Sequence, residues 1–133
     1  MGISTYLANK LLDHQVGKTS YTMPTVYVAL SSTTPTAGGT NVTEPATGGY
    51  ARQATSAATW ATAASGATTT AAAITWSQAS ADYLSGANLT YGVLFDASSG
   101  GNMLAFGAIA TPKNVLNGDT PSIAIGDLDI TLS

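Results

Sequence analysis

The sequence of 133 residues contains no cysteine and only one histidine. The absence of thiols excludes disulfide frameworks, thiolate zinc sites and cysteine nucleophiles. A single imidazole is also too few for a histidine-rich metal centre. No apolar run approaches the roughly 20 residues of a membrane-spanning helix. The start of the chain has no basic segment followed by an apolar one, so we expect neither a secretory signal nor contact with a membrane.

Charged residues are scarce as well: they make up 8% of the chain, against roughly 25% in ordinary soluble domains. Alanine, threonine, serine and glycine take their places. A surface with so little charge does not repel its neighbours, so we infer that much of it is covered by sister copies or partners. The net charge of -3, with four basic residues in all, argues against nucleic acid, because phosphate binding needs clustered cations.

The length predicts a single domain over residues 1–133 that can bury a core without covalent staples. One helix is predicted, over residues 4–16, where apolar residues recur at three- and four-residue spacings. Ser4 can cap its start and Gly17 can end it. Because so short a helix is not stable alone, we expect it to dock on the rest of the domain.

Two apolar runs of strand composition, 89–95 and 103–109, are separated by the polar segment 96–102. Gly100 and Gly101 in that segment reach positive φ without strain, and their neighbours form turns by bonding their own backbone. The pattern predicts a β-hairpin. Both faces of both arms are apolar, so we expect the hairpin to be central and covered on each side.

Shorter strand patterns complete the chain. Asn117-Gly118 is a strong hairpin signal, and a turn is predicted at Ser65-Gly66 within the small-residue segment 61–70. Seven to nine short strands at this spacing predict a mainly β, single-domain antiparallel β-sandwich with one short N-terminal α-helix. The remaining strands are predicted at 25–30, 50–60, on both sides of the turn in 61–70, and at 71–78, 122–125 and 127–132.

Residues 31–49 form a long loop or arm with two prolines, four glycines and hardly any large apolar residue. Loops of this length in a small domain are usually functional or disordered. We therefore expect the arm, together with segment 61–70, to order against a partner. Thr34, Pro35 and Thr36 are the contact candidates in the arm.

Arg52 is the only arginine, and it follows a glycine-rich turn beside Tyr50 and Gln53. Arginine and tyrosine are enriched in interface hot spots, so one interpretation is an anchor for a partner. The other is an ion pair that ties the loop to a carboxylate of the same chain. Trp60 and Trp76 fit a core or an interface better than a sugar-stacking platform, because few charged or amide groups are nearby. The interface candidates are Thr34, Pro35, Thr36, Tyr50, Arg52, Gln53 and Trp60.

No catalytic residue, metal ligand or cofactor site is predicted, and we expect the chain not to be an enzyme. His14 lies beside Asp13, but no nucleophile or cleft accompanies the pair. Asp127 and Asp129 share one face of a strand and follow Asp119. Calcium takes such oxygen ligands, but the spacing matches no calcium loop, and a solvated edge explains these acids better.

Several stretches together resemble a family of small proteins encoded among tailed-phage structural genes, often labelled tail fibre or minor structural proteins. The similarity spans nearly the whole chain. It rests on the start Ser4-Thr5-Tyr6-Leu7-Ala8-Asn9, the strand 25–30 followed by Thr34-Pro35-Thr36, the element 48–53, the hairpin 92–104 and Thr111-Pro112-Lys113.

The resemblance implies a virion component that is made in the host cytoplasm and acts by adhesion. One possibility is a capsid decoration (cement) protein, commonly a jelly-roll or related sandwich, that binds the major capsid protein or sister subunits as a dimer or trimer. The other is a tail or tail-fibre-associated protein, structural or receptor-binding. A single domain without fibre-like repeats favours decoration and a place on the capsid surface.

Overall fold

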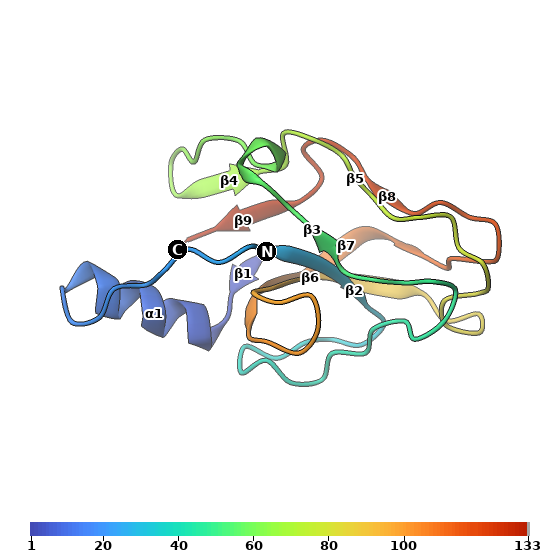
Figure 1. The fold of residues 1–133 in the computed structure, drawn as a ribbon, viewed down its shortest axis with the longest axis horizontal. Coiled ribbons are helices and arrows are strands. Elements are labelled where there is room, and N and C mark those ends of the chain that lie inside the picture. The colour runs from blue at the N-terminus through green and yellow to red at the C-terminus, as the bar shows by residue number, and fades with distance from the viewer. Residues whose placement is uncertain (133) are drawn as a thin grey trace.

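The predicted hairpin forms the centre of a five-stranded antiparallel sheet in the computed structural model, which describes residues 1–132 (Figure 1). β6 (Leu89–Phe95) pairs with β7 (Met103–Lys113), so the hairpin is confirmed. Its outer neighbours come from distant parts of the chain. The strand order is β1-β7-β6-β2-β3, where β1 is Gly2–Ile3, β2 is Tyr27–Ser31 and β3 is Gln53–Ala54.

A pair of glycines makes room for the start of the chain on one face of this sheet. Gly92 and Gly107 face each other across β6 and β7. A Cβ built on Gly92 would lie 3.4 Å from Met1 Cε and 3.6 Å from Leu128 Cδ1. Met1 and Leu128 therefore pack where two side chains are missing, and the Met1 ammonium donates to the Asp129 carbonyl at 2.7 Å.

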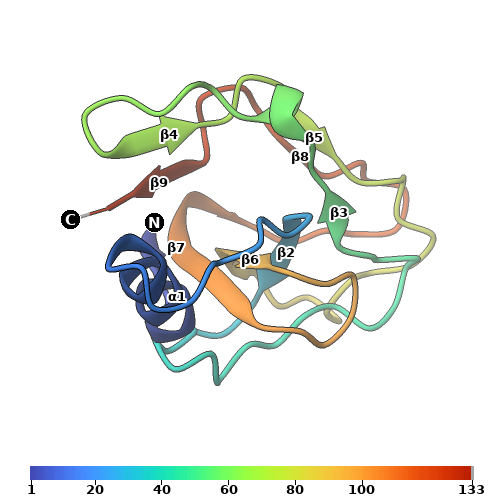
Figure 2. The same ribbon diagram turned by 60° about the vertical axis from the view of Figure 1, so that its left-hand side comes forward.

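Four short strands form a second layer over this face, as Figure 2 shows. They pair as two separate ladders, and the main apolar core, which includes Trp76, Leu94 and Leu104, lies beneath them. Within residues 1–132 the layer is two separate ladders and not one continuous sheet. The mainly β fold with one N-terminal helix is confirmed, whereas the predicted jelly-roll-like β-sandwich is not shown. The ladders are β4 (Ala67–Thr69) with β9 (Asp129–Thr131), and β5 (Ile74–Thr75) with β8 (Ser122–Ile123).

The arm predicted at 31–49 begins at residue 32, because Ser31 ends β2, and it covers the opposite face. Val42 packs there on a smaller buried cluster that contains Val93, Phe95 and Met103. The arm is held by its own hydrogen bonds, such as Ser32 N–H to the Thr43 carbonyl at 3.0 Å. Both faces of the hairpin are thus covered, which confirms its central position.

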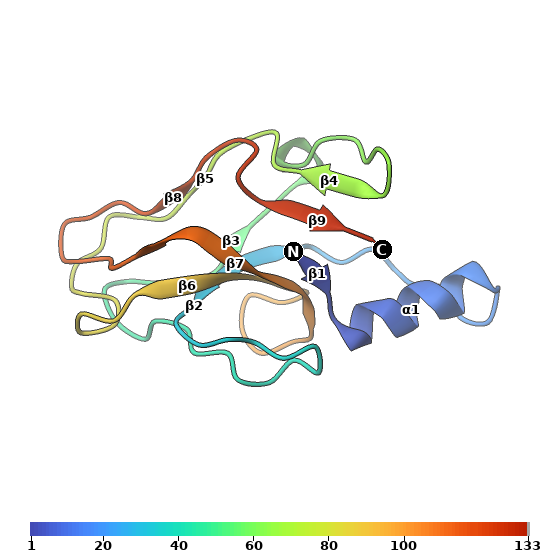
Figure 3. The same cartoon turned by 180° about the vertical axis from the view of Figure 1, so that it is seen from behind.

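The predicted helix is confirmed as α1 (Thr5–Gln15). Ser4 caps it: the buried Ser4 Oγ accepts the Leu7 N–H at 3.1 Å and donates to the Met103 carbonyl at 2.5 Å. These bonds fix the first turn on β7, while no helix residue is fully buried and the helix extends from the body (Figure 3). No helix within residues 1–132 is long and apolar enough to cross a membrane.

The strand predicted at 50–60 was wrong in extent. Only β3 joins the sheet, and the 3-10 helix η1 (Ala57–Thr59) follows it. Thr55 extends the contact with the β2 side by one residue, because both its N–H and its hydroxyl donate to the Val26 carbonyl, each at 2.8 Å. A capping box between Ser56 and Thr59 then closes the 3-10 turn.

The two predicted turns had different outcomes. Ser65 and Gly66 both take positive φ, and the turn leads into β4 as expected. Asn117-Gly118 also forms a turn, but β8 pairs with β5 and not with the strand before the turn, so the hairpin signal was misleading. The reason is a tertiary contact: Asp82 Oδ1 accepts the Asn117 N–H at 2.8 Å and holds this turn on the 79–83 segment.

Candidate protein interface

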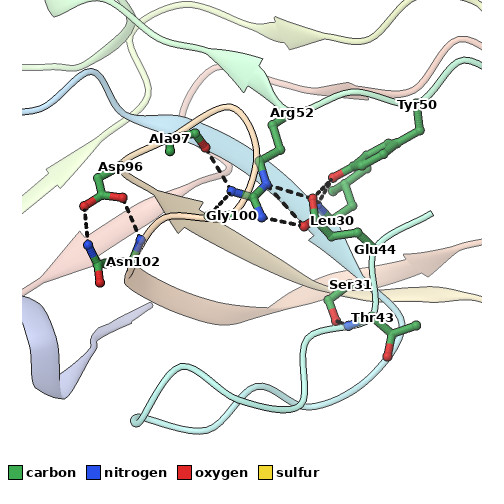
Figure 4. Close-up of polar contacts among 10 residues, drawn as sticks. All are labelled: Leu30, Ser31, Thr43, Glu44, Tyr50, Arg52, Asp96, Ala97, Gly100 and Asn102. Atoms are coloured by element: carbon green, nitrogen blue, oxygen red, sulfur yellow. Dashed lines mark hydrogen bonds and ion pairs between the residues drawn. The ribbon is translucent and has the colours of Figure 1, made fainter. Parts of the chain in front are cut away.

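The only arginine and the only glutamate of the chain form an ion pair. Arg52 Nη2 lies 2.7 Å from Glu44 Oε2, and Arg52 Nε donates to Glu44 Oε1 at 3.0 Å (Figure 4). The Arg52 side chain is 8% exposed. Of the two interpretations of Arg52, the structure therefore shows the ion pair within the chain. An added role in binding a partner stays a prediction.

The same guanidinium also holds the tip of the central hairpin. Arg52 Nη1 donates to the carbonyls of Ala97 at 2.9 Å and Gly100 at 2.8 Å. Its central carbon lies 3.6 Å from the centre of the Phe95 ring, which is the geometry of a cation–π contact. One side chain thus joins the arm, the strand entering β3 and the hairpin tip.

Tyr50 adds a second link between the arm and the sheet. Its hydroxyl accepts the Leu30 N–H at 2.9 Å and donates to Glu44 Oε1 at 2.9 Å. Its ring meets the Tyr83 ring edge to face, with centres 5.5 Å apart. Burial is the main reason that the pKa of Tyr50 is raised above its usual value, so the hydroxyl stays protonated and can donate to Glu44.

The hairpin tip is a closed turn of its own. Asp96 Oδ1 accepts the Asn102 N–H at 2.6 Å, and Asp96 Oδ2 accepts the Asn102 side-chain amide at 2.9 Å (Figure 4). Gly101 takes a φ of +72°, which glycine adopts without the strain a Cβ causes. The tip is therefore held by hydrogen bonds within the turn as well as by Arg52.

The tips of the arm and the hairpin lie together. Residues 37–39 and 101–103 line one hollow beside the start of α1, and the Thr5 N–H donates to the Ala37 carbonyl at 2.9 Å. A second hollow, of about 340 Å³, is lined by Ser98 and Ser99 of the hairpin tip together with Glu44, Tyr50 and Arg52. We call the exposed residues 36–40 and 98–102 the arm–hairpin surface. It contains no charged side chain.

The predicted interface residues do not all meet. Tyr50 and Arg52 come together with the arm, in which Thr34 and Thr36 are exposed and Pro35 is buried. Trp60 lies apart, in the second layer, where its Nε1 donates to Thr55 Oγ1 at 3.1 Å. Gln53 is half-buried in β3, and its amide donates to the Ala51 carbonyl at 2.9 Å.

Glu44 was missed as a member of this cluster. The available signal was its uniqueness, because the single glutamate lies eight residues before the single arginine across a glycine turn. Local patterns gave no reason to place either residue against the hairpin tip, since Ala97 and Gly100 are about 45 residues further along the chain.

The acids and the histidine considered for catalysis or metal binding do not form a cluster that could hold a metal ion in the described part of the chain. Among residues 1–132, no three His, Cys, Asp or Glu side chains lie close enough to hold a metal ion. His14 is exposed, and its Nδ1 accepts the Tyr21 N–H at 3.1 Å. Asp127 and Asp129 are both exposed, as a solvated edge requires.

Comparison with known proteins identifies the family. The model of the family described as Podophage GP4 fiber I protein gp80 matches residues 2–131. No curated protein matches the chain. The family is one of phage fibre structural proteins, which confirms that the chain is a non-enzymatic virion protein. The match gives no support to the capsid decoration hypothesis and favours the tail-fibre alternative. The chain therefore belongs to the podophage GP4 fiber I protein gp80 family.

Proposed function

We propose that this chain is a structural contact subunit of the tail fibre and that it binds its neighbours through the arm–hairpin surface. The observation that carries the proposal is the way this surface is held. The surface is uncharged and consists of small residues. Arg52 links its two parts, because it bonds both Glu44 of the arm and the carbonyls of the hairpin tip.

Such a surface suits adhesion for two physical reasons. Small side chains let the backbone of a neighbour come close, and the lack of charge avoids the cost of burying unpaired ions. Because Arg52 and Tyr50 already fix the arm, little conformational entropy is lost on binding. The partner we propose is a sister copy, in a dimer or trimer, or another fibre protein.

The location can be tested directly on phage particles. Gold-labelled antibody against this chain is expected to decorate the tail fibres in electron micrographs. Decoration of the head without the fibres would overturn the proposal. A control with particles from a mutant phage that lacks this protein shows whether the labelling is specific.

The surface itself is tested by adding charge where none exists. Ala37→Lys with Ser99→Lys is expected to reduce incorporation of the protein into particles more than tenfold, because two cations are then buried without partners. Ser77→Lys is the matched control, since Ser77 is exposed outside this surface. Normal incorporation of the double variant would show that the contact lies elsewhere.

A further inference from the structure

A cavity of about 420 Å³ lies between the end of β7 and the segment 114–123. It is separate from the arm–hairpin surface and falls within the ~300–1,000 Å³ range of small-molecule sites. Most of its wall is apolar. The apolar lining comes from Leu30, Trp76, Leu89, Ile109, Val115 and Ile123.

Two residues of this wall carry polar atoms that have no partner. Trp76 is 2% exposed, and its Nε1 is buried without a hydrogen bond. The side-chain oxygen of Asn114 is buried in the same way. Within residues 1–132 these are the two buried side-chain polar atoms that lack a partner. A buried polar atom without a partner is unfavourable, so two such atoms on residues that line one cavity point to an occupant.

The chemistry of the two atoms restricts that occupant. The indole N–H only donates and the amide oxygen only accepts, and a hydroxyl group can satisfy both kinds. The apolar wall suits the face of a ring. The exposed residues Lys113 and Asp119 also line the cavity and have opposite charges, and Asp119 Oδ2 already accepts the Leu116 N–H at 2.9 Å. A neutral ligand therefore fits better than an ionic one.

We propose that this cavity binds a neutral hydroxylated ring of the size of one sugar residue. The inference deepens the proposed function, on which it rests, because a sugar subsite gives a fibre subunit contact with a cell surface. Both polar atoms are closed to water in the free chain. We therefore expect the half-buried Asn114 side chain and the Trp76 ring to shift when the ligand enters.

The two tryptophans provide an internal comparison for the test. Trp60 Nε1 already donates to Thr55 Oγ1, whereas Trp76 Nε1 has no partner. In ¹⁵N-labelled protein, titration with the methyl glycosides of glucose, galactose, mannose and rhamnose is expected to move the Trp76 indole resonance with at least one sugar. The Trp60 resonance is expected to stay in place. Trp60→Phe and Trp76→Phe identify which signal is which.

A variant of the acceptor makes the test specific. Asn114→Leu is expected to weaken binding of that glycoside at least tenfold, because the hydroxyl loses its acceptor. Asn9→Leu makes the same chemical change on the exposed face of α1 and is expected to leave the affinity unchanged. Equal affinities for the two variants would overturn the proposal.

The outcomes separate this inference from the proposed function. If no glycoside moves the Trp76 resonance, the cavity holds water or nothing and the inference is overturned, even if antibodies locate the chain on the fibre. If a glycoside binds through Asn114 but the chain is absent from the fibre, the proposed function fails and the binding site stands.

Discussion

The Arg52 guanidinium lies over the Phe95 ring, with 3.6 Å between its central carbon and the ring centre. Phe95 is the last residue of β6, and the hairpin tip follows it. Two carbonyls of that tip accept hydrogen bonds from Arg52 Nη1. The contact therefore links the sheet core to the arm–hairpin surface. The contribution of this one side chain can be tested by mutation.

Arg52→Ala is expected to lower the free energy of unfolding by about 3 kcal/mol, because Glu44 and two carbonyls lose a largely buried partner. Glu44→Gln is expected to cost less, because the amide keeps one acceptor oxygen. Urea titration followed by tryptophan fluorescence gives both values. Lys18→Ala is the control, with an expected change within about 0.5 kcal/mol. A similar loss for Arg52→Ala and Lys18→Ala would contradict the prediction.

Gly48→Ala is expected to destabilise the chain by about 3 kcal/mol, through both strain and overlap. Gly48 has a φ of +72°, and an added Cβ would overlap the Ala81 carbonyl oxygen and lie 2.9 Å from the Tyr83 ring. Gly86→Ala separates the two causes. Gly86 has a φ of +94° with open space around it, so about 1 kcal/mol of strain alone is expected there. Thermal unfolding of both variants measures the difference, and equal losses would exclude the overlap.

Ser4→Ala is expected to cost about 1–2 kcal/mol, because Ser4 caps α1 and also bonds the Met103 carbonyl. Since no residue of α1 is fully buried, we further expect its amides to exchange faster than those of β6. Hydrogen exchange measures this, with Ser20→Ala at an exposed position as the control. Unchanged exchange in α1 of the Ser4 variant would show that the cap does not hold the helix.

Stability is expected to fall above about pH 10, the usual pKa of tyrosine. Burial raises the pKa of Tyr50, so its proton is held more tightly in the folded chain than in the unfolded one. This contribution is complete below the unfolded pKa and is lost as the pH rises through the folded one. Burial also raises the pKa of Tyr21 and Tyr83, which add to the same trend.

Tyr50→Phe removes the largest of these contributions. The variant is expected to be less stable than the original chain at pH 7, because the Leu30 N–H loses its acceptor. Between pH 9 and pH 11 its free energy of unfolding is expected to fall less steeply. Urea titrations at the two pH values check this, and equal slopes for the two proteins would show that Tyr50 does not govern alkaline stability.

The elements with strong local signals were predicted well. Ser4 and Gly17 bracket α1 because capping depends on residues within one turn. The central hairpin was predicted because its two strands are neighbours in sequence, joined by a short turn, and because both faces of each strand carry apolar residues. The membership in a phage virion family was also accessible, since it rests on stretches spread along the whole chain.

The pairing of the short strands was not accessible. β4 pairs with β9 across about sixty residues, and each contributes only three residues to the ladder. So few residues carry no measurable periodicity. Their partners depend on contacts between distant segments. Such a contact, from Asp82 to Asn117, also holds the Asn117-Gly118 turn away from a hairpin, and β8 joins β5.

The sequence by itself determined a weakly charged, cysteine-free chain with one capped helix and one two-sided hairpin. These features depend on composition and on neighbours a few residues apart. Only the tertiary structure decided that Arg52 pairs with Glu44 and binds the hairpin tip. It also decided that Trp76 and Asn114, whose buried polar atoms have no partner, line the same cavity. The physical reason is that hydrogen bonds and ion pairs are satisfied by whatever folding brings within reach, which no local pattern specifies.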